Sequence, residues 1–100
     1  MFGIVVRFDV VDVEAAQAFD AAISEALIGI KEREPGTLVY AVHKVADAPL
    51  ARVFYELYTD RDAHATHEAT DHMKAFFTQV EQYIARARVD YLDTPSGKVF

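Results

Sequence analysis

Side chains that can carry chemistry are concentrated between residues 55 and 72. Three of the chain's four histidines fall within nine residues of this stretch, beside several carboxylates and two tyrosines. Imidazole and carboxylate groups placed together are the usual components of general acid–base catalysis, so this stretch is the first candidate for a site. Its members are Tyr55, Glu56, Tyr58, Asp60, Asp62, His64, His67, Glu68, Asp71 and His72.

The histidine cluster is also a candidate metal site, but its spacing argues against one. The segment from His67 to His72 is similar to the zinc-protease pattern HExxH, which places two histidines four residues apart on one helical face. Here the second histidine comes five residues after the first, about 140° around a helix. His64 and His67 do have the helical i, i+3 spacing. They could share a metal with Glu68 or His72, but no ligand from another segment is indicated, and we predict no metal.

Two polar residues interrupt apolar strands. His43 lies in an apolar segment, where it is either a satisfied core histidine or part of a cavity wall. Glu56 lies in the middle of the segment VFYELY, and because an unpaired buried charge is costly, it must find a partner or a pocket. The aromatic residues nearby form either an ordinary core or the wall of an apolar pocket. They are Phe54, Tyr55, Tyr58, Phe76, Phe77 and Tyr83.

The composition excludes several classes of function. The chain has no cysteine, tryptophan or asparagine, so disulfides, thiolate sites and mechanisms that require Trp or Asn are excluded. The net charge of -6, with scattered basic residues, argues against nucleic-acid binding. The four glycines form no phosphate-binding loop. No apolar run approaches the ~18 residues that span a bilayer, so we expect no membrane partner and, by default, a cytoplasmic protein.

Apolar periodicity predicts one domain over residues 1–100, with a loose tail at 94–100. Asp12 is the expected cap of the long helix, and Pro35 its stop. The apolar stripe of the last helix extends from Met73 to Ile84. The predicted elements are a strand at 3–11, a helix at 13–33, strands at 37–45 and 52–58, helical pieces at 60–69 and from 70 or 71 onward, and a strand at 88–92.

The order of these elements, β-α-β-β-α-β, is that of the ferredoxin-like split βαβ fold, an α+β class with a four-stranded antiparallel sheet. Both faces of the strands at 37–45 and 52–58 carry apolar side chains. Two helices can cover only one face of such a sheet, so the other needs a partner. We therefore predict a homodimer that packs sheet against sheet.

Three motifs, taken together, resemble the antibiotic biosynthesis monooxygenase domain family, and the similarity covers nearly the whole chain. They are the EPGTLVY turn at 34–40, the VFYELYxD strand end at 53–60 and the AHxxHxxTxH helix at 63–72. Their order and spacing are those of the family. The resemblance implies a dimeric α+β barrel built from two ferredoxin-like chains.

The resemblance implies three kinds of enzyme. Some members are cofactor-independent monooxygenases that oxidise phenols or hydroquinones to quinones, some degrade haem, and some isomerise a small phosphorylated signalling compound. Haem degradation in this family uses Asn and Trp, which the chain lacks. The sequence therefore favours a small aromatic substrate and no cofactor. The alternatives are the isomerase, whose phosphate could be held by Lys44 or Arg52, and a module that only binds an aromatic ligand.

By the same resemblance, roles can be given to individual residues. His67 is the expected base, or the group that orients the substrate hydroxyl. Glu56 is expected to orient or tune it, with Tyr58 as the third catalytic residue. The residues expected to contact the substrate are His43, His72, Tyr55, Phe76 and Phe77.

Overall fold

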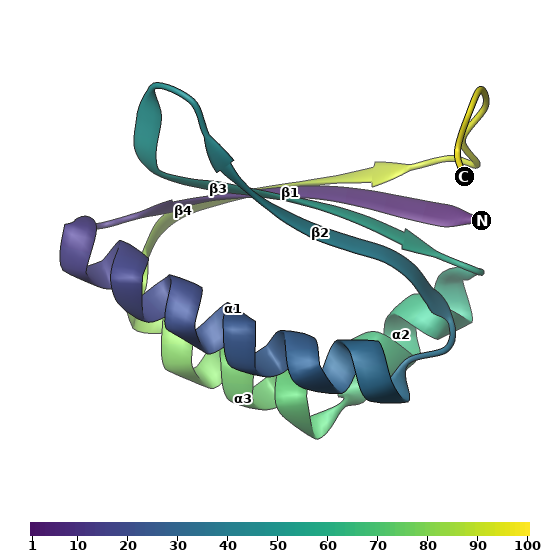
Figure 1. Ribbon diagram of the computed structural model, residues 1–100, viewed down its shortest axis with the longest axis horizontal. Helices are drawn as coiled ribbons and strands as arrows, with labels where there is room; N and C mark the ends of the chain where they lie inside the picture. The colour runs from purple at the N-terminus through teal and green to yellow at the C-terminus, as the bar shows by residue number, and fades with distance from the viewer.

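The computed structural model describes all 100 residues, with a four-stranded antiparallel sheet whose one face is covered by helices (Figure 1). The strands lie in the order β2-β3-β1-β4. This topology confirms the predicted ferredoxin-like α+β fold. In chain order the elements are β1 (Phe2–Val10), α1 (Val13–Arg33), β2 (Thr37–Val45), β3 (Ala48–Tyr58), α2 (Arg61–Ala69), α3 (Asp71–Val80), the 3-10 turn η1 (Glu81–Tyr83) and β4 (Ile84–Leu92).

Helix α1 begins and ends as its sequence predicts. The Asp12 carboxylate caps it by accepting a hydrogen bond from the backbone N–H of Ala15 at 2.7 Å. Glu34 leaves the helical conformation because Pro35 follows it. This stop places Glu34 inside the molecule, where the residue is only 7% exposed.

A break separates α2 from α3, as predicted, and a side chain caps the start of each helix. Asp60 caps α2 through the backbone N–H of Ala63 at 2.8 Å. The Thr70 hydroxyl then accepts from the Met73 backbone N–H at 3.3 Å and begins α3. The two helices run in different directions below the sheet (Figure 1). Each therefore presents its own side chains to the same sheet face.

Strands β3 and β4 are longer than the sequence predicts. The hairpin between β2 and β3 turns at residues 46–47, where Asp47 has a φ of 64°, a conformation that Asp tolerates. β3 consequently starts at Ala48 instead of residue 52. Ile84, expected on the stripe of the last helix, instead begins β4 opposite Val10 of β1. Both corrections arise from strand pairing, which local periodicity does not report.

The core between sheet and helices is built around aromatic contacts. Phe8 and Phe54 meet edge to face at 5.5 Å between ring centroids, and Phe19 of α1 meets Phe76 of α3 at 5.5 Å. Phe19 also meets Phe54 at 5.9 Å, which links helices to sheet. No helix combines the length and the apolar character needed to cross a membrane.

No helix lies over the opposite face of the sheet (Figure 1). The strand register places Val5 beside Tyr55 and Arg7 beside Val53 on this face. The side chains of Val5, Val53 and Tyr55 are only partly buried. An apolar sheet face left partly open is typical of a surface covered by a partner.

We predict that a second copy of the chain covers this face. Sedimentation velocity at micromolar concentration should give a species of twice the 11.2 kDa chain mass. Val53→Asp should give a monomer, because the dimer would bury the new charge. Ile28→Asp, on an exposed position of α1, is the matched control and should stay dimeric. A monomeric wild-type protein would contradict the prediction.

Candidate active site

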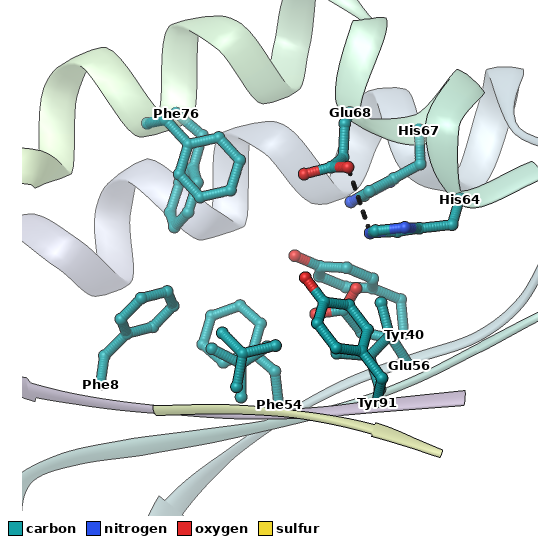
Figure 2. A pocket seen from close by; sticks show the side chains of 13 residues that line it. Phe8, Tyr40, Phe54, Glu56, His64, His67, Glu68, Phe76 and Tyr91 are labelled. Carbon is teal, nitrogen blue, oxygen red and sulfur yellow. Dashed lines mark ion pairs between the residues drawn. The ribbon is translucent and has the colours of Figure 1, made fainter. Parts of the chain in front are cut away.

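A cavity of about 200 Å³ lies between the helix-covered face of the sheet and helices α2 and α3 (Figure 2). Its apolar wall includes Phe8, Phe54, Phe76 and Phe77. Its polar lining consists of Tyr40, Glu56, His64, His67, Glu68 and Tyr91. An apolar cavity with a few convergent polar groups is typical of a small-molecule site.

His67 is the most buried titratable side chain of α2. It is 3% exposed, and its Nδ1 lies 2.6 Å from Oε1 of Glu34. Figure 2 shows the ring extending toward the cavity with a nitrogen at its tip. One ring nitrogen is therefore held by the protein, and the other, Nε2, is available to a ligand.

Glu34 is held by donors from three elements. Its carboxylate accepts hydrogen bonds from the Thr37 hydroxyl at 2.7 Å, from Nδ1 of His67 and from Nε2 of His72. Burial alone would raise the pKa of Glu34, but the hydrogen bonds from His72, Thr37 and His67 outweigh it and lower that pKa. Glu34 is thus an ionised carboxylate at neutral pH.

The charge on Glu34 determines the tautomer of His67. An ionised carboxylate can only accept, so the proton of the imidazole lies on Nδ1 and Nε2 keeps its lone pair. Burial lowers the pKa of His67, and the neighbouring Glu34 carboxylate partly offsets that effect. His67 is consequently a neutral imidazole whose free lone pair faces the cavity, which is what a general base requires.

His72 does not line the cavity, contrary to the sequence prediction. Its Nε2–H donates to Oε2 of Glu34 from the α3 side, and its ring borders a groove between α1 and α3. Gly29 of α1 packs directly on this ring, where a Cβ would overlap it. The break between α2 and α3 is the reason, because the two rings approach the same carboxylate from two different helices.

Glu56 of β3 is the second buried carboxyl group, and it lines the cavity. It accepts one hydrogen bond, from the Tyr58 hydroxyl at 2.5 Å. Burial raises the pKa of Glu56 to about 7, with Glu68 and Glu34 contributing in the same direction against the Tyr58 hydrogen bond. Near neutral pH this group can therefore give or take a proton.

Tyr58 supports the site without lining it. It is fully buried, and its ring lies 5.0 Å from that of His64 and 5.5 Å from that of His67. Burial and the Glu56 carboxylate raise the pKa of Tyr58, so it keeps its proton. Tyr58 is thus a donor that holds Glu56 in place.

The structure places two further predicted contact residues away from this cavity. Neither His43 nor Tyr55 lines it. They lie on the opposite face of the sheet, where His43 pairs with Val53 and Tyr55 with Val5. Strand alternation is the physical reason, because residues next to Val42 and Phe54 must point the other way. The predicted contact residues Phe76 and Phe77 do line the cavity.

Several residues of the site are not predicted by the sequence. Glu34 is part of the EPG motif, whose local signal indicates only the end of a helix. Tyr40 pairs with Glu56 across β2 and β3, and Tyr91 reaches the cavity from β4. The alternation of β4 does place Val89 and Tyr91 on one face, which is a usable signal. The pairing of Tyr40 with Glu56 depends on strand register and leaves no local signal.

His64, which is largely buried, and Glu68, which is exposed, form a pair on α2. Nε2 of His64 lies 3.5 Å from the Glu68 carboxylate, four residues further along the helix (Figure 2). The two side chains border the cavity on its helical side. No group of three or more His, Cys, Asp or Glu side chains is arranged to hold a metal ion.

A ferredoxin-like chain with an acid–base cluster beside an apolar cavity has the features of a small-molecule site. The family model for antibiotic biosynthesis monooxygenases matches residues 1–79. The chain belongs to this family. Membership supports a monooxygenase activity in general terms.

Solved structures of similar fold agree with this assignment. A protein of Caulobacter crescentus CB15, provisionally named an antibiotic biosynthesis monooxygenase, is 27% identical, with a TM-score of 0.88 over 95% of this chain and 90% of its own. A similarly named protein of Nitrosomonas europaea is 26% identical, with a TM-score of 0.85 over 94% and 98%. A conserved protein of Methanosarcina mazei, 20% identical with a TM-score of 0.83 over 94% and 92%, shares the fold. A comparison with curated proteins found no match.

The raised pKa of Glu56 makes a testable contribution to stability. The folded state binds the Glu56 proton more tightly than the unfolded chain, so the contribution is favourable at acid pH and is lost as the pH rises from about 4.5 to about 7. The free energy of unfolding is measured in urea at fixed protein concentration. Between pH 5 and pH 8, that of the wild type should fall by about 2 to 3 kcal/mol relative to that of Glu56→Gln. A difference that does not change with pH would contradict the assignment.

Proposed function

We propose that this protein is a cofactor-independent monooxygenase that oxidises a small phenol or hydroquinone with dioxygen. The observation that carries the proposal is the neutral, buried imidazole of His67, whose Nδ1 is held by the ionised Glu34 and whose Nε2 faces an apolar cavity. That arrangement removes a proton from a weak acid such as a phenol without needing another group. Family membership supports the same type of reaction.

The chemistry follows from deprotonation. Nε2 of His67 takes the phenolic proton, and the resulting phenolate, which is electron-rich, reduces dioxygen by one electron. The aryloxyl radical and superoxide combine at a ring carbon that carries hydrogen, ortho or para to the hydroxyl. Loss of that hydrogen as a proton breaks the O–O bond and leaves a carbonyl. One oxygen atom enters the product and the other leaves as water, so the substrate supplies all four electrons.

The site can accommodate both charges that form in this reaction, the imidazolium of His67 and the phenolate. The imidazolium formed at His67 is stabilised by the Glu34 carboxylate, as in other base–carboxylate pairs. It then returns its proton to the departing oxygen. The aromatic wall limits water near the phenolate, which keeps the electron transfer and radical combination from competing with hydrolytic side reactions. Glu56, with its pKa near 7, orients a second hydroxyl or exchanges a proton with it.

The geometry is less favourable to the isomerase alternative. Arg52, one of two candidates for binding a phosphate, is buried and donates to the Asp20 carboxylate at 2.8 and 3.0 Å. The other candidate, Lys44, does not line the cavity, and neither does any other Lys or Arg. A phosphorylated substrate would therefore find no cationic partner in this cavity.

Removal of the base should abolish turnover. With one-ring and two-ring phenols and hydroquinones as substrates, His67→Ala should lower oxygen consumption roughly a hundredfold or more. His43→Gln, on the opposite face of the sheet, is the matched control and should keep wild-type activity. Tight binding of an aromatic without oxygen uptake would favour a binding module. Proton exchange without oxygen uptake would favour the isomerase.

The role of Glu34 should be visible both in the value of kcat/KM and in the pH profile of kcat/KM. Its carboxylate raises the pKa of His67 relative to burial alone. Glu34→Gln should therefore lower kcat/KM at least about tenfold and move the acid limb of its pH profile to lower pH. Glu32→Gln, an exposed change at the end of the same helix, should do neither. A slower enzyme with an unmoved acid limb would mean that Glu34 acts only on folding.

A further inference from the structure

The charged groups of the cavity all favour one class of ligand. Two carboxyl groups line it, Glu56 from β3 and Glu68 from α2, and no Lys or Arg does. Building on the proposed function, we infer that the cavity selects uncharged hydroxylated aromatics of one or two rings. It excludes aromatic carboxylates, sulfonates and phosphates of the same size.

The positive charges near the site are engaged elsewhere. The guanidinium of Arg52 is bound by Asp20 and by the backbone carbonyls of Pro49 and Ala51. Arg61, at the start of α2, lies over the Phe2 ring at 4.4 Å from its centroid. An anionic group in the cavity would therefore leave water without gaining a Lys or Arg partner, which is costly.

Glu68 is the main source of the repulsion. Its side chain is 57% exposed and borders the cavity, and Figure 2 shows its carboxylate above the space between His64 and Tyr91. Glu56 lies across this space on the sheet side. An anion in the cavity therefore lies beside the negative charge of Glu68 and beside Glu56, and like charges repel.

The same groups complement a neutral polyhydroxylated ring. Glu56, Glu68 and Nε2 of His67 are acceptors, and each phenolic hydroxyl is a donor. Figure 2 shows the hydroxyl groups of Tyr40 and Tyr91 directed into the same space, where they can donate to a substrate oxygen. The preference therefore combines repulsion of anions with attraction for hydroxyl donors.

The volume of the cavity limits the number of aromatic rings that a ligand can have. An engineered protein cavity of about 150 Å³ takes up benzene. The present cavity, at about 200 Å³, has room for one ring or two fused rings. Larger polycyclic skeletons would have to project into solvent.

The test compares two probes of equal size, 5-hydroxy-2-naphthamide and 5-hydroxy-2-naphthoate. Their naphthol fluorescence is titrated with the wild-type protein under anaerobic conditions, so that binding is measured without turnover. The amide should bind at least about tenfold more tightly than the carboxylate. The ratio should shrink as ionic strength rises. Equal or tighter binding of the carboxylate would overturn the inference.

Two variants locate the effect in the cavity. Glu68→Gln keeps a good helix former and should reduce the amide-to-carboxylate ratio by roughly threefold to fivefold. Asp47→Asn removes the same charge from the β2–β3 turn, where Asn tolerates the positive φ, and should leave the ratio unchanged. An unchanged ratio in Glu68→Gln, or an equal fall in both variants, would contradict the role of Glu68.

Oxygen uptake with the same two probes separates this inference from the proposed function. Oxygen uptake with the amide but not with the carboxylate supports both the monooxygenase proposal and the charge selection. If neither probe is oxidised, nor any phenol of the wider panel, while the binding ratio holds, the monooxygenase proposal fails and the charge selection stands. Equal oxidation of both probes supports the monooxygenase and overturns the selection.

Discussion

The buried carboxylate of Glu34 is the interaction on which the arrangement of the site depends. It sits at the end of α1 and accepts hydrogen bonds from Thr37 at the start of β2, from His67 on α2 and from His72 on α3. A carboxylate at this depth is tolerable only when its oxygens are satisfied, so the packing of the three helices and the ionisation of Glu34 require each other. The orientation of His67 toward the cavity is a consequence of the same contacts.

The protein contains two buried glutamates whose surroundings give them opposite properties. Glu34 has three donors and a lowered pKa, whereas Glu56 has one donor, Tyr58, and a pKa raised to about 7 by burial. One is a fixed negative charge and the other is a proton carrier near neutral pH. Separation of pKa values between like groups by their environments is a common way to assign acid and base roles within one site.

The fold and the cavity contribute differently to function. Related chains with about a quarter of their residues in common keep the same backbone arrangement, which reflects the layered packing of sheet and helices. Membership in the antibiotic biosynthesis monooxygenase family therefore supports a general type of reaction. The choice of substrate depends on the side chains of this particular cavity, since one fold can carry many sites. Here the side chains that line the cavity are aromatic, acidic, hydroxyl-bearing or imidazoles, with no Lys or Arg among them.

The sequence by itself determined the elements, their order and part of the site. Periodicity, the Asp12 and Thr70 caps and the stop at Pro35 are local signals, and a carboxyl group within an apolar strand could be recognised as unusual at Glu56. Tertiary structure decided the rest: that His72 binds Glu34 and does not line the cavity, that Tyr40 lies beside Glu56, and that Glu34 lies at the centre of the site. The reason is that these placements depend on strand register and on contacts more than thirty residues apart, and neither leaves a mark in the local pattern.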